Sequence, residues 1–173
     1  FEYGKERKQI IGEDKVFDFS LGNPNVEAPD VVNETLINLL KYKDSTTLHG
    51  YTSAVGDLNV RESISEYLNN KYKAETDPSL IYMTVGAAAA LTISLNAILN
   101  ENEEVIVLSP YFPEYKVFIE KAGGVIKEVL CNTKTFKPDL ELLNKSINEN
   151  TKAIIINYPN NPTGVVLNEE EMI

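Results

Sequence analysis

The sequence predicts an α/β protein with a mostly parallel sheet that carries helices on both faces, in a three-layer αβα arrangement. From residue 80 onward, short runs rich in Val and Ile alternate with segments of helical periodicity. Turn residues bound each run, and the segments between runs are long enough for crossover helices. Right-handed crossovers would place those helices on the two faces of one sheet.

Composition places the 173-residue chain among ordinary globular proteins. Hydrophobic residues make up 43% of it, charged residues 24%, and the formal net charge is −10 at pH 7. Nucleic acid and anionic membranes are poor partners for such a chain, because they are held through clustered Lys and Arg. The single cysteine, Cys131, cannot form an internal disulfide, and its thiol is expected to be inert. With no signal-peptide pattern and no long apolar run, a cytoplasmic location is expected.

The first part of the chain combines an extended segment with two helical patterns. Residues 16–21 alternate like a strand and run into a turn at Gly22. Apolar residues recur at helical spacing over residues 32–40 and again over residues 57–72. Residues 50–53 have no period and are expected to form a loop.

Strands and helices are expected to alternate through the rest of the chain. Pro138-Asp139 suits the start of a helix, and Gly123-Gly124 suits the end of one. The expected strands cover residues 80–84, 105–108, 125–130 and 153–157. The expected helices between them cover residues 86–99, 114–122 and 138–147.

The turn at Gly86 follows the first of these strands, where open α/β sheets bind ligands. It opens a helix whose free backbone N–H groups suit a phosphate dianion, and Ala87 and Ala88 leave the approach open. The same alanines would also suit a plain helix packed on a sheet, so the residues alone leave both interpretations open. Neither a P-loop pattern nor a Gly-x-Gly-x-x-Gly pattern is present.

Two proline-bearing segments follow the later strands. Residues 109–115 place Phe112 between two prolines, where its ring could lie against a planar ligand or simply cover the core. The octapeptide Asn157-Tyr-Pro-Asn-Asn-Pro-Thr-Gly164 holds Asn161 as a rigid amide donor, or merely shapes the crossover to the next helix.

These segments together resemble the pyridoxal-phosphate (PLP) dependent aminotransferases of fold type I, the class I/II or aspartate aminotransferase family. The octapeptide carries most of the resemblance, since it contains the family's Asn-Pro-Thr-Gly signature. The resemblance implies an N-terminal part of such an enzyme. Residues 1–45 would then belong to the small domain and hinge, and residues 46–173 to a truncated part of the large PLP-binding domain.

The resemblance also implies roles for individual residues. At the Gly86 turn, the amides of Ala87 and Ala88 would meet the cofactor's phosphate. Phe112 would stack on the pyridine ring, at a position where many members have Trp or Tyr. Asn161 would donate to the cofactor's phenolic oxygen and so lower the proton affinity of the neighbouring imine nitrogen.

Two residues nearer the N-terminus complete the implied set. Tyr51, five residues before Gly56, would reach across a dimer interface to the partner subunit's cofactor phosphate, which implies a homodimer. Gly22 would line the pocket for the substrate carboxylate with its backbone. From the residues alone, a loop tyrosine and a turn glycine are equally good interpretations.

Pyridoxal chemistry needs a lysine amine that forms a Schiff base with the cofactor. In the family this lysine, an aspartate near the pyridine nitrogen and a carboxylate-binding arginine all follow the Asn-Pro-Thr-Gly signature at long range. No lysine of this chain has the family's context, so no catalytic residue is assigned. The parent protein is expected to transfer an amino group between an amino acid, with an aspartate-like one favoured, and a 2-oxo acid. The 173-residue chain alone is expected to be inactive.

Other interpretations stay open. The parent could be a PLP-dependent C–S lyase or decarboxylase of the same fold, or the chain could be a non-catalytic α/β module that holds a phosphorylated ligand at Gly86. One His and one Cys leave no zinc or iron site of usual composition. Arg61 is expected to form a surface ion pair, and His49 to lie at the surface or an interface.

Overall fold

The computed structural model describes residues 2–17, 22 and 26–172. The chain separates into two compact units, Phe1–Ser53 and Ala54–Ile173, and each is described by itself. This division falls later than the predicted boundary after residue 45. The assignment of the first part to a small domain and hinge stays a prediction.

The first unit is helical. Its elements are α1 (Glu2–Ile11), the 3-10 turn η1 (Glu13–Lys15), α2 (Asp30–Tyr42) and α3 (Ser45–His49). The predicted helix over residues 32–40 is confirmed by α2, whereas α1 and α3 were not expected. Asp44 caps α3, because its carboxylate accepts a hydrogen bond from the Thr47 amide at 2.9 Å. Of the expected strand over 16–21, residues 16 and 17 are not in a strand and the others lie outside the described residues.

The second unit begins with α4 (Leu58–Tyr72), which confirms the helix predicted there. Asp57 caps it by accepting from the Asn59 amide at 2.9 Å. The expectation that Arg61 forms a surface ion pair is wrong. Arg61 is buried, and its guanidinium donates to the carbonyl oxygens of Gly56 and Pro78, which belong to segments on either side of α4 in the sequence.

The strand expected over residues 80–84 is also wrong. The turn η2 (Pro78–Leu80) occupies its start, and residues 81–84 are in no strand. A strand needs a ladder of hydrogen bonds with a neighbour. Among the described residues, one backbone bond outside η2 reaches this segment, from the Met83 amide to the Val55 oxygen at 3.0 Å.

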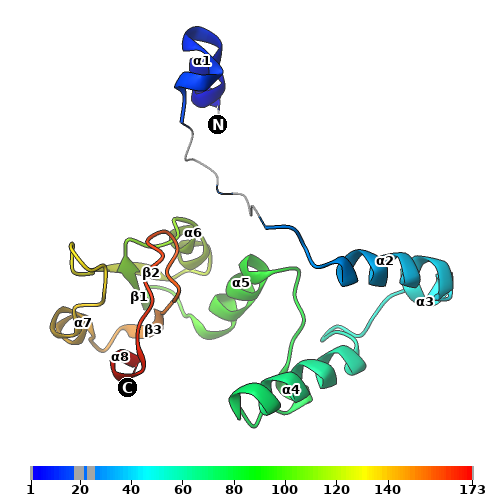
Figure 1. The fold of residues 1–173 in the computed structure, drawn as a ribbon. Coiled ribbons are helices and arrows are strands. Elements are labelled where there is room, and N and C mark those ends of the chain that lie inside the picture. Colours follow the sequence, from blue (N-terminus) through cyan, green and yellow to red (C-terminus); the bar gives the residue numbers. More distant parts are fainter. Residues whose placement is uncertain (1, 18–21, 23–25, 173) are drawn as a thin grey trace. The chain divides into compact units, whose positions relative to one another are not determined.

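The second unit contains a three-stranded parallel sheet (Figure 1). Its strands are β1 (Glu104–Ser109), β2 (Val125–Leu130) and β3 (Thr151–Ile155), in the order β2-β1-β3. The helices α5 (Ala87–Ile98), α6 (Glu114–Lys121) and α7 (Leu140–Ser146) connect or precede the strands, and α8 (Glu169–Met172) follows. The three later predicted strands and the three helices are therefore confirmed within a few residues.

Two apolar clusters on opposite sides of β1 establish the layers. On one side, Val105 and Val107 pack with residues of α5 and α6, namely Leu95, Tyr115 and Ile119. On the other side, Ile106 and Leu108 pack with Val129, Cys131 and, from α7, Leu143. Successive β1 side chains thus point to opposite faces, as a strand requires. The predicted helices on both faces of a parallel sheet are confirmed.

Candidate cofactor site

The carboxyl edge of the sheet gathers two of the predicted segments. β1 and β3 are adjacent and parallel, so the loops that follow them start at the same edge. Phe112 lies in the loop after β1, and Asn161 in the loop after β3. This is the edge at which open α/β sheets bind ligands.

Helix α5 runs from the carboxyl edge of the sheet toward its amino edge. Its last turn leads through residues 99–103 into the amino end of β1. Leu99 also lies next to Gly124, directly before β2, since a Cβ added to Gly124 would be 2.9 Å from the Leu99 Cδ1. Leu91 and Leu95 pack on the same face of β1. The N-terminal end of α5, at Gly86, is therefore directed toward the carboxyl side of the sheet.

The Gly86 turn has the properties of an anion cradle. Gly86 is the N-cap of α5 with φ 93° and ψ 174°, and no side chain caps the helix. The first amides of a helix have no acceptor within the helix, and they lie at the positive end of its dipole. Gly86, Ala87 and Ala88 are all exposed, and nothing lies within 4 Å of where a Cβ on Gly86 would be. The turn can therefore present free amides to a phosphate.

Phe112 is held within a group of three aromatic rings. Its ring meets that of Tyr115 edge-on, with centroids 5.6 Å apart and planes at 77°. Tyr115 also stacks on Tyr111 at 6.3 Å. The Tyr111 hydroxyl donates to the Glu128 carboxylate at 2.9 Å, which fixes the loop to β2. Burial raises the pKa of Tyr115 and, together with Glu128, that of Tyr111, so both hydroxyls stay protonated donors.

Tyr115 packs against Phe112, a contact that was not predicted from the sequence. Tyr115 lies in the first turn of α6, whereas Phe112 lies in the loop before that helix, so helical spacing does not predict this contact. The Tyr115 amide also donates to the Phe112 carbonyl oxygen at 3.0 Å.

The two asparagines of the octapeptide differ in what they contact. The Asn160 side chain accepts from the Thr163 amide at 3.1 Å and from the Thr163 hydroxyl at 2.7 Å. The Asn160 backbone closes the loop through Val165 and Gly164. Asn161 is exposed, and among the described residues its side chain takes part in no hydrogen bond. Asn160 therefore shapes the loop, and the Asn161 amide remains available to a ligand.

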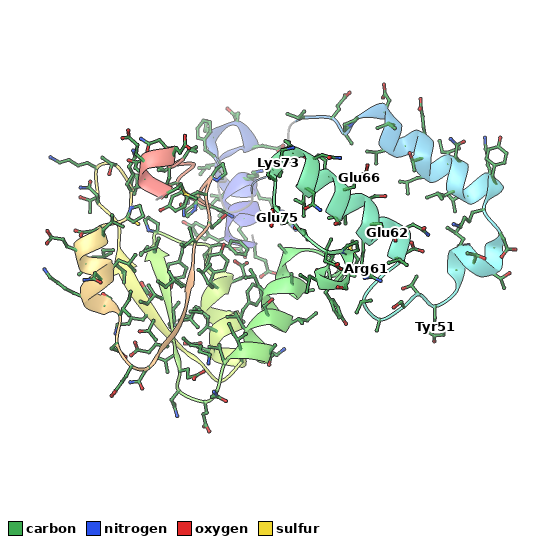
Figure 2. The ribbon with its side chains drawn as sticks, turned by 90° about the horizontal axis from the view of Figure 1, so that it is seen from below. Tyr51, Arg61, Glu62, Glu66, Lys73 and Glu75 are labelled. Atoms are coloured by element: carbon green, nitrogen blue, oxygen red, sulfur yellow. The ribbon has the colours of Figure 1, made fainter. Side chains whose placement is uncertain are left out.

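Tyr51 and Gly22 belong to the first unit. Both are exposed, and Tyr51 projects from the loop between α3 and α4 (Figure 2). That loop over residues 50–53 has no regular structure, as predicted. The roles of Tyr51 and Gly22 toward cofactor and substrate stay predictions.

Within the described ranges, no group of three or more His, Cys, Asp and Glu side chains could hold a metal ion. No helix in the described part of the chain combines the length and the hydrophobicity needed to cross a bilayer.

Comparison with known proteins gives the family. Residues 14–172 match the family model described as aminotransferase class I and II. The chain belongs to this family. Its members use pyridoxal 5′-phosphate, which agrees with the free amides at the Gly86 turn.

Individual relatives agree with this assignment. The chain is 39% identical over 158 residues to a probable aspartate/prephenate aminotransferase of Aquifex aeolicus, covering 91% of this chain and 39% of the relative. It is 36% identical over 172 residues to an aspartate aminotransferase of Thermotoga maritima, covering 98% of this chain and 44% of the relative. The chain thus spans less than half the length of these relatives.

Solved structures share the fold. An aminotransferase of Eubacterium rectale superimposes with a TM-score of 0.93 at 47% identity, over 99% of this chain and 44% of that one. The aspartate aminotransferase structure of Thermotoga maritima gives a TM-score of 0.83 at 34% identity, over 99% of this chain and 45% of that one. The described three-layer unit is therefore part of the aminotransferase fold.

Proposed function

We propose that this chain is the part of a PLP-dependent aminotransferase that holds the cofactor's phosphate and one side of its ring. The whole protein would transfer an amino group between an amino acid and a 2-oxo acid. The observation that carries the proposal is the Gly86 turn, an uncapped helix start with exposed amides, in a chain of the aminotransferase family.

Each residue of the site has a role that its surroundings support. The amides of Ala87 and Ala88 would bind the phosphate dianion with the help of the helix dipole. The Phe112 ring, held by Tyr115, would pack against the pyridine ring. The Asn161 amide would donate to the cofactor's phenolic oxygen, which favours the anionic form of that oxygen. The bound cofactor supplies the electron sink that amino-group transfer requires.

We also propose that the 173 residues alone are inactive, because no lysine of the chain stands in the family's context for the Schiff-base lysine. Lys127 and Lys152 pair with Glu104 and Glu103, at the amino edge of the sheet and away from the loops of the site. The other lysine pairs of the second unit, all with carboxylates, are Lys116–Glu120, Lys137–Glu171 and Lys145–Glu141. The remaining lysines of this unit, Lys71, Lys73, Lys121 and Lys134, also lack the family's context for the Schiff-base lysine. We therefore expect the amine that forms the Schiff base to lie outside these residues.

For the substrate we propose an aspartate-like amino acid, because relatives named as aspartate or aspartate/prephenate aminotransferases are 36–39% identical to the chain. Gly22 would line the pocket for the substrate carboxylate. Arg61 is not its partner, because the guanidinium is buried against carbonyl oxygens. We also propose a homodimer in which the exposed Tyr51 reaches the partner subunit's cofactor phosphate.

The whole protein, purified with PLP, tests this function. Aspartate and 2-oxoglutarate should react to give oxaloacetate and glutamate, and borohydride should fix the cofactor on a lysine outside residues 1–173, as peptide mapping would show. Release of pyruvate or sulfide from suitable amino acids without amino-group transfer would favour a lyase instead. Cofactor fixed on a lysine within residues 1–173 would contradict the proposed inactivity of the chain alone.

A further inference from the structure

The segment that leads into the Gly86 turn is held in place by few contacts. Residues 81–84 belong to no sheet, and the Met83 amide donates to the Val55 oxygen at 3.0 Å. Gly56 packs directly against the Met83 side chain, since an added Cβ on Gly56 would lie 2.3 Å from the Met83 Cγ. The position of Met83 therefore depends on the loop that contains Val55 and Gly56.

Arg61 fixes that loop from α4 (Figure 2). Its Nε donates to the Gly56 oxygen at 3.3 Å, and one terminal nitrogen donates to the Pro78 oxygen at 2.8 Å. The residue is only 9% exposed. The planar guanidinium has donors in a rigid fork, so one side chain can hold two separate backbone segments in a fixed relation.

The two segments held by Arg61 flank the path to the phosphate turn. Pro78 lies shortly before Met83 in the chain, and Gly56 contacts Met83 directly. From Met83 to Gly86 there are only three residue steps, which span at most about 11 Å. The Thr84 hydroxyl closes this short path by donating to the Gly86 oxygen at 3.0 Å. Because the connecting segment is short, a shift of Met83 would also displace Gly86.

We propose that Arg61 is a positioning residue for cofactor binding. By holding Gly56 and Pro78 together, it sets the position of Met83 and so aims the amides of the Gly86 turn. Arg61 itself lies away from that turn in the sequence and donates to backbone carbonyls. This inference rests on the proposed function, because it assumes that the turn binds the cofactor's phosphate.

Arg61→Lys and Gly56→Ala in the whole protein test the two sides of this arrangement. Lys keeps the charge but loses the fork. Ala introduces a Cβ against Met83 and also strains the backbone, because Gly56 has a φ of 98°. Because small misplacements of a binding group weaken its interactions strongly, each variant should bind PLP about tenfold more weakly than wild type in an absorbance titration. Arg61→Lys, the milder change, also decides the matter if Gly56→Ala fails to fold.

Ser65→Ala is the matched control. Ser65 lies on the same helix, is 4% exposed, and donates to the Thr76 oxygen at 2.6 Å, but it contacts neither Gly56 nor Pro78 through its hydroxyl. Its loss should lower the thermal midpoint of the apoprotein and leave the PLP dissociation constant within about twofold of wild type.

The outcomes separate the inference from the function on which it rests. If wild type binds PLP and both test variants bind it equally well while losing thermal stability, Arg61 is merely structural and the inference is overturned. If wild type itself shows no PLP binding, the proposed function fails and the inference with it. Weaker PLP binding in both test variants, with Ser65→Ala unchanged, supports the positioning role.

Discussion

The Lys127 ammonium on β2 lies 2.9 Å from the Glu104 carboxylate at the start of β1. The same carboxylate oxygen accepts a hydrogen bond from the Asn148 side chain, just before β3, also at 2.9 Å. One glutamate thus connects β1 to β2 and to the segment that leads into β3, at the amino edge of the sheet and opposite the loops of the candidate site. The site and this ionic connection therefore occupy different ends of the same strands.

This arrangement predicts a pH-dependent effect of Glu104→Gln. The hydrogen bond from Lys127, followed by that from Asn148, holds the pKa of Glu104 below the usual glutamate value. A carboxyl whose pKa is lower in the folded than in the unfolded state stabilises the fold above its unfolded pKa, and this contribution is lost as pH falls through the folded pKa. Glu104→Gln should therefore lower the urea midpoint at about pH 7, and the difference from wild type should shrink at about pH 4.

Glu120→Gln provides the control for that experiment. Glu120 pairs with Lys116 at 3.9 Å on the exposed face of α6. Exposed pairs of this kind contribute little. The control should leave the urea midpoint unchanged at both pH values, and an equal loss in Glu120→Gln and Glu104→Gln would show that position in the sheet does not matter.

The two asparagines of the octapeptide should separate stability from activity. Asn160→Ala removes both bonds that Thr163 donates to the side chain and should lower the free energy of unfolding by about 1–2 kcal/mol, as the loss of a helix cap does. Asn161→Ala breaks no hydrogen bond of the described fold, so stability should stay within about 0.5 kcal/mol.

Catalytic activity should depend mainly on Asn161. A hydrogen bond to a charged group contributes about 1.5–3 kcal/mol, so Asn161→Ala should lower kcat of the whole protein by roughly 10- to 100-fold. The pH at which the bound cofactor's absorption band titrates should also rise, since the anionic oxygen loses a donor. An Asn161→Ala protein with the wild-type titration would argue against contact between this amide and the cofactor.

Cys131 should be unreactive in the folded protein. Its side chain is 8% exposed in the cluster beneath α7, and burial raises the pKa of the thiol. Because the thiolate is the reactive form, a disulfide reagent at about pH 8 should label the native protein far more slowly than the urea-unfolded one. Equal labelling rates in the two states would mean that this side of the sheet opens readily.

Local patterns predicted the three strands of the sheet and the helices α5, α6 and α7. The strands over 105–108, 125–130 and 153–157 were found because an apolar run with turn residues at both ends is typical of a buried strand. Residues 80–84 have the same pattern, but the structure provides them with no ladder. Whether an apolar run finds a neighbouring strand depends on the rest of the fold, which periodicity does not describe.

The candidate site, too, could be predicted from the sequence only in part. The rule that parallel strands share a carboxyl edge placed Phe112 and Asn161 together. It could not distinguish Asn161 from Asn160, because their roles depend on where the loop folds back onto Thr163. It could not find Arg61 either, since its acceptor at Pro78 lies 17 residues along the chain.

The backbone conformation of Gly86 gives the last prediction. With φ 93° and ψ 174°, Gly86 occupies a region that is open almost only to glycine. The space around it is free, so Gly86→Ala would suffer from backbone strain and not from collision. We expect a loss of about 1–3 kcal/mol in stability, or a rotation of the first α5 amides that relieves the strain.

Either response should weaken cofactor binding, because the amides of Ala87 and Ala88 are aimed by this turn. Gly123→Ala is the matched control, since Gly123 also has a positive φ, of 83°, but lies between α6 and β2 at the amino edge of the sheet. Both variants should melt earlier than wild type, whereas only Gly86→Ala should raise the PLP dissociation constant, by roughly tenfold. Equal PLP affinity in the two variants would contradict a phosphate site at the start of α5.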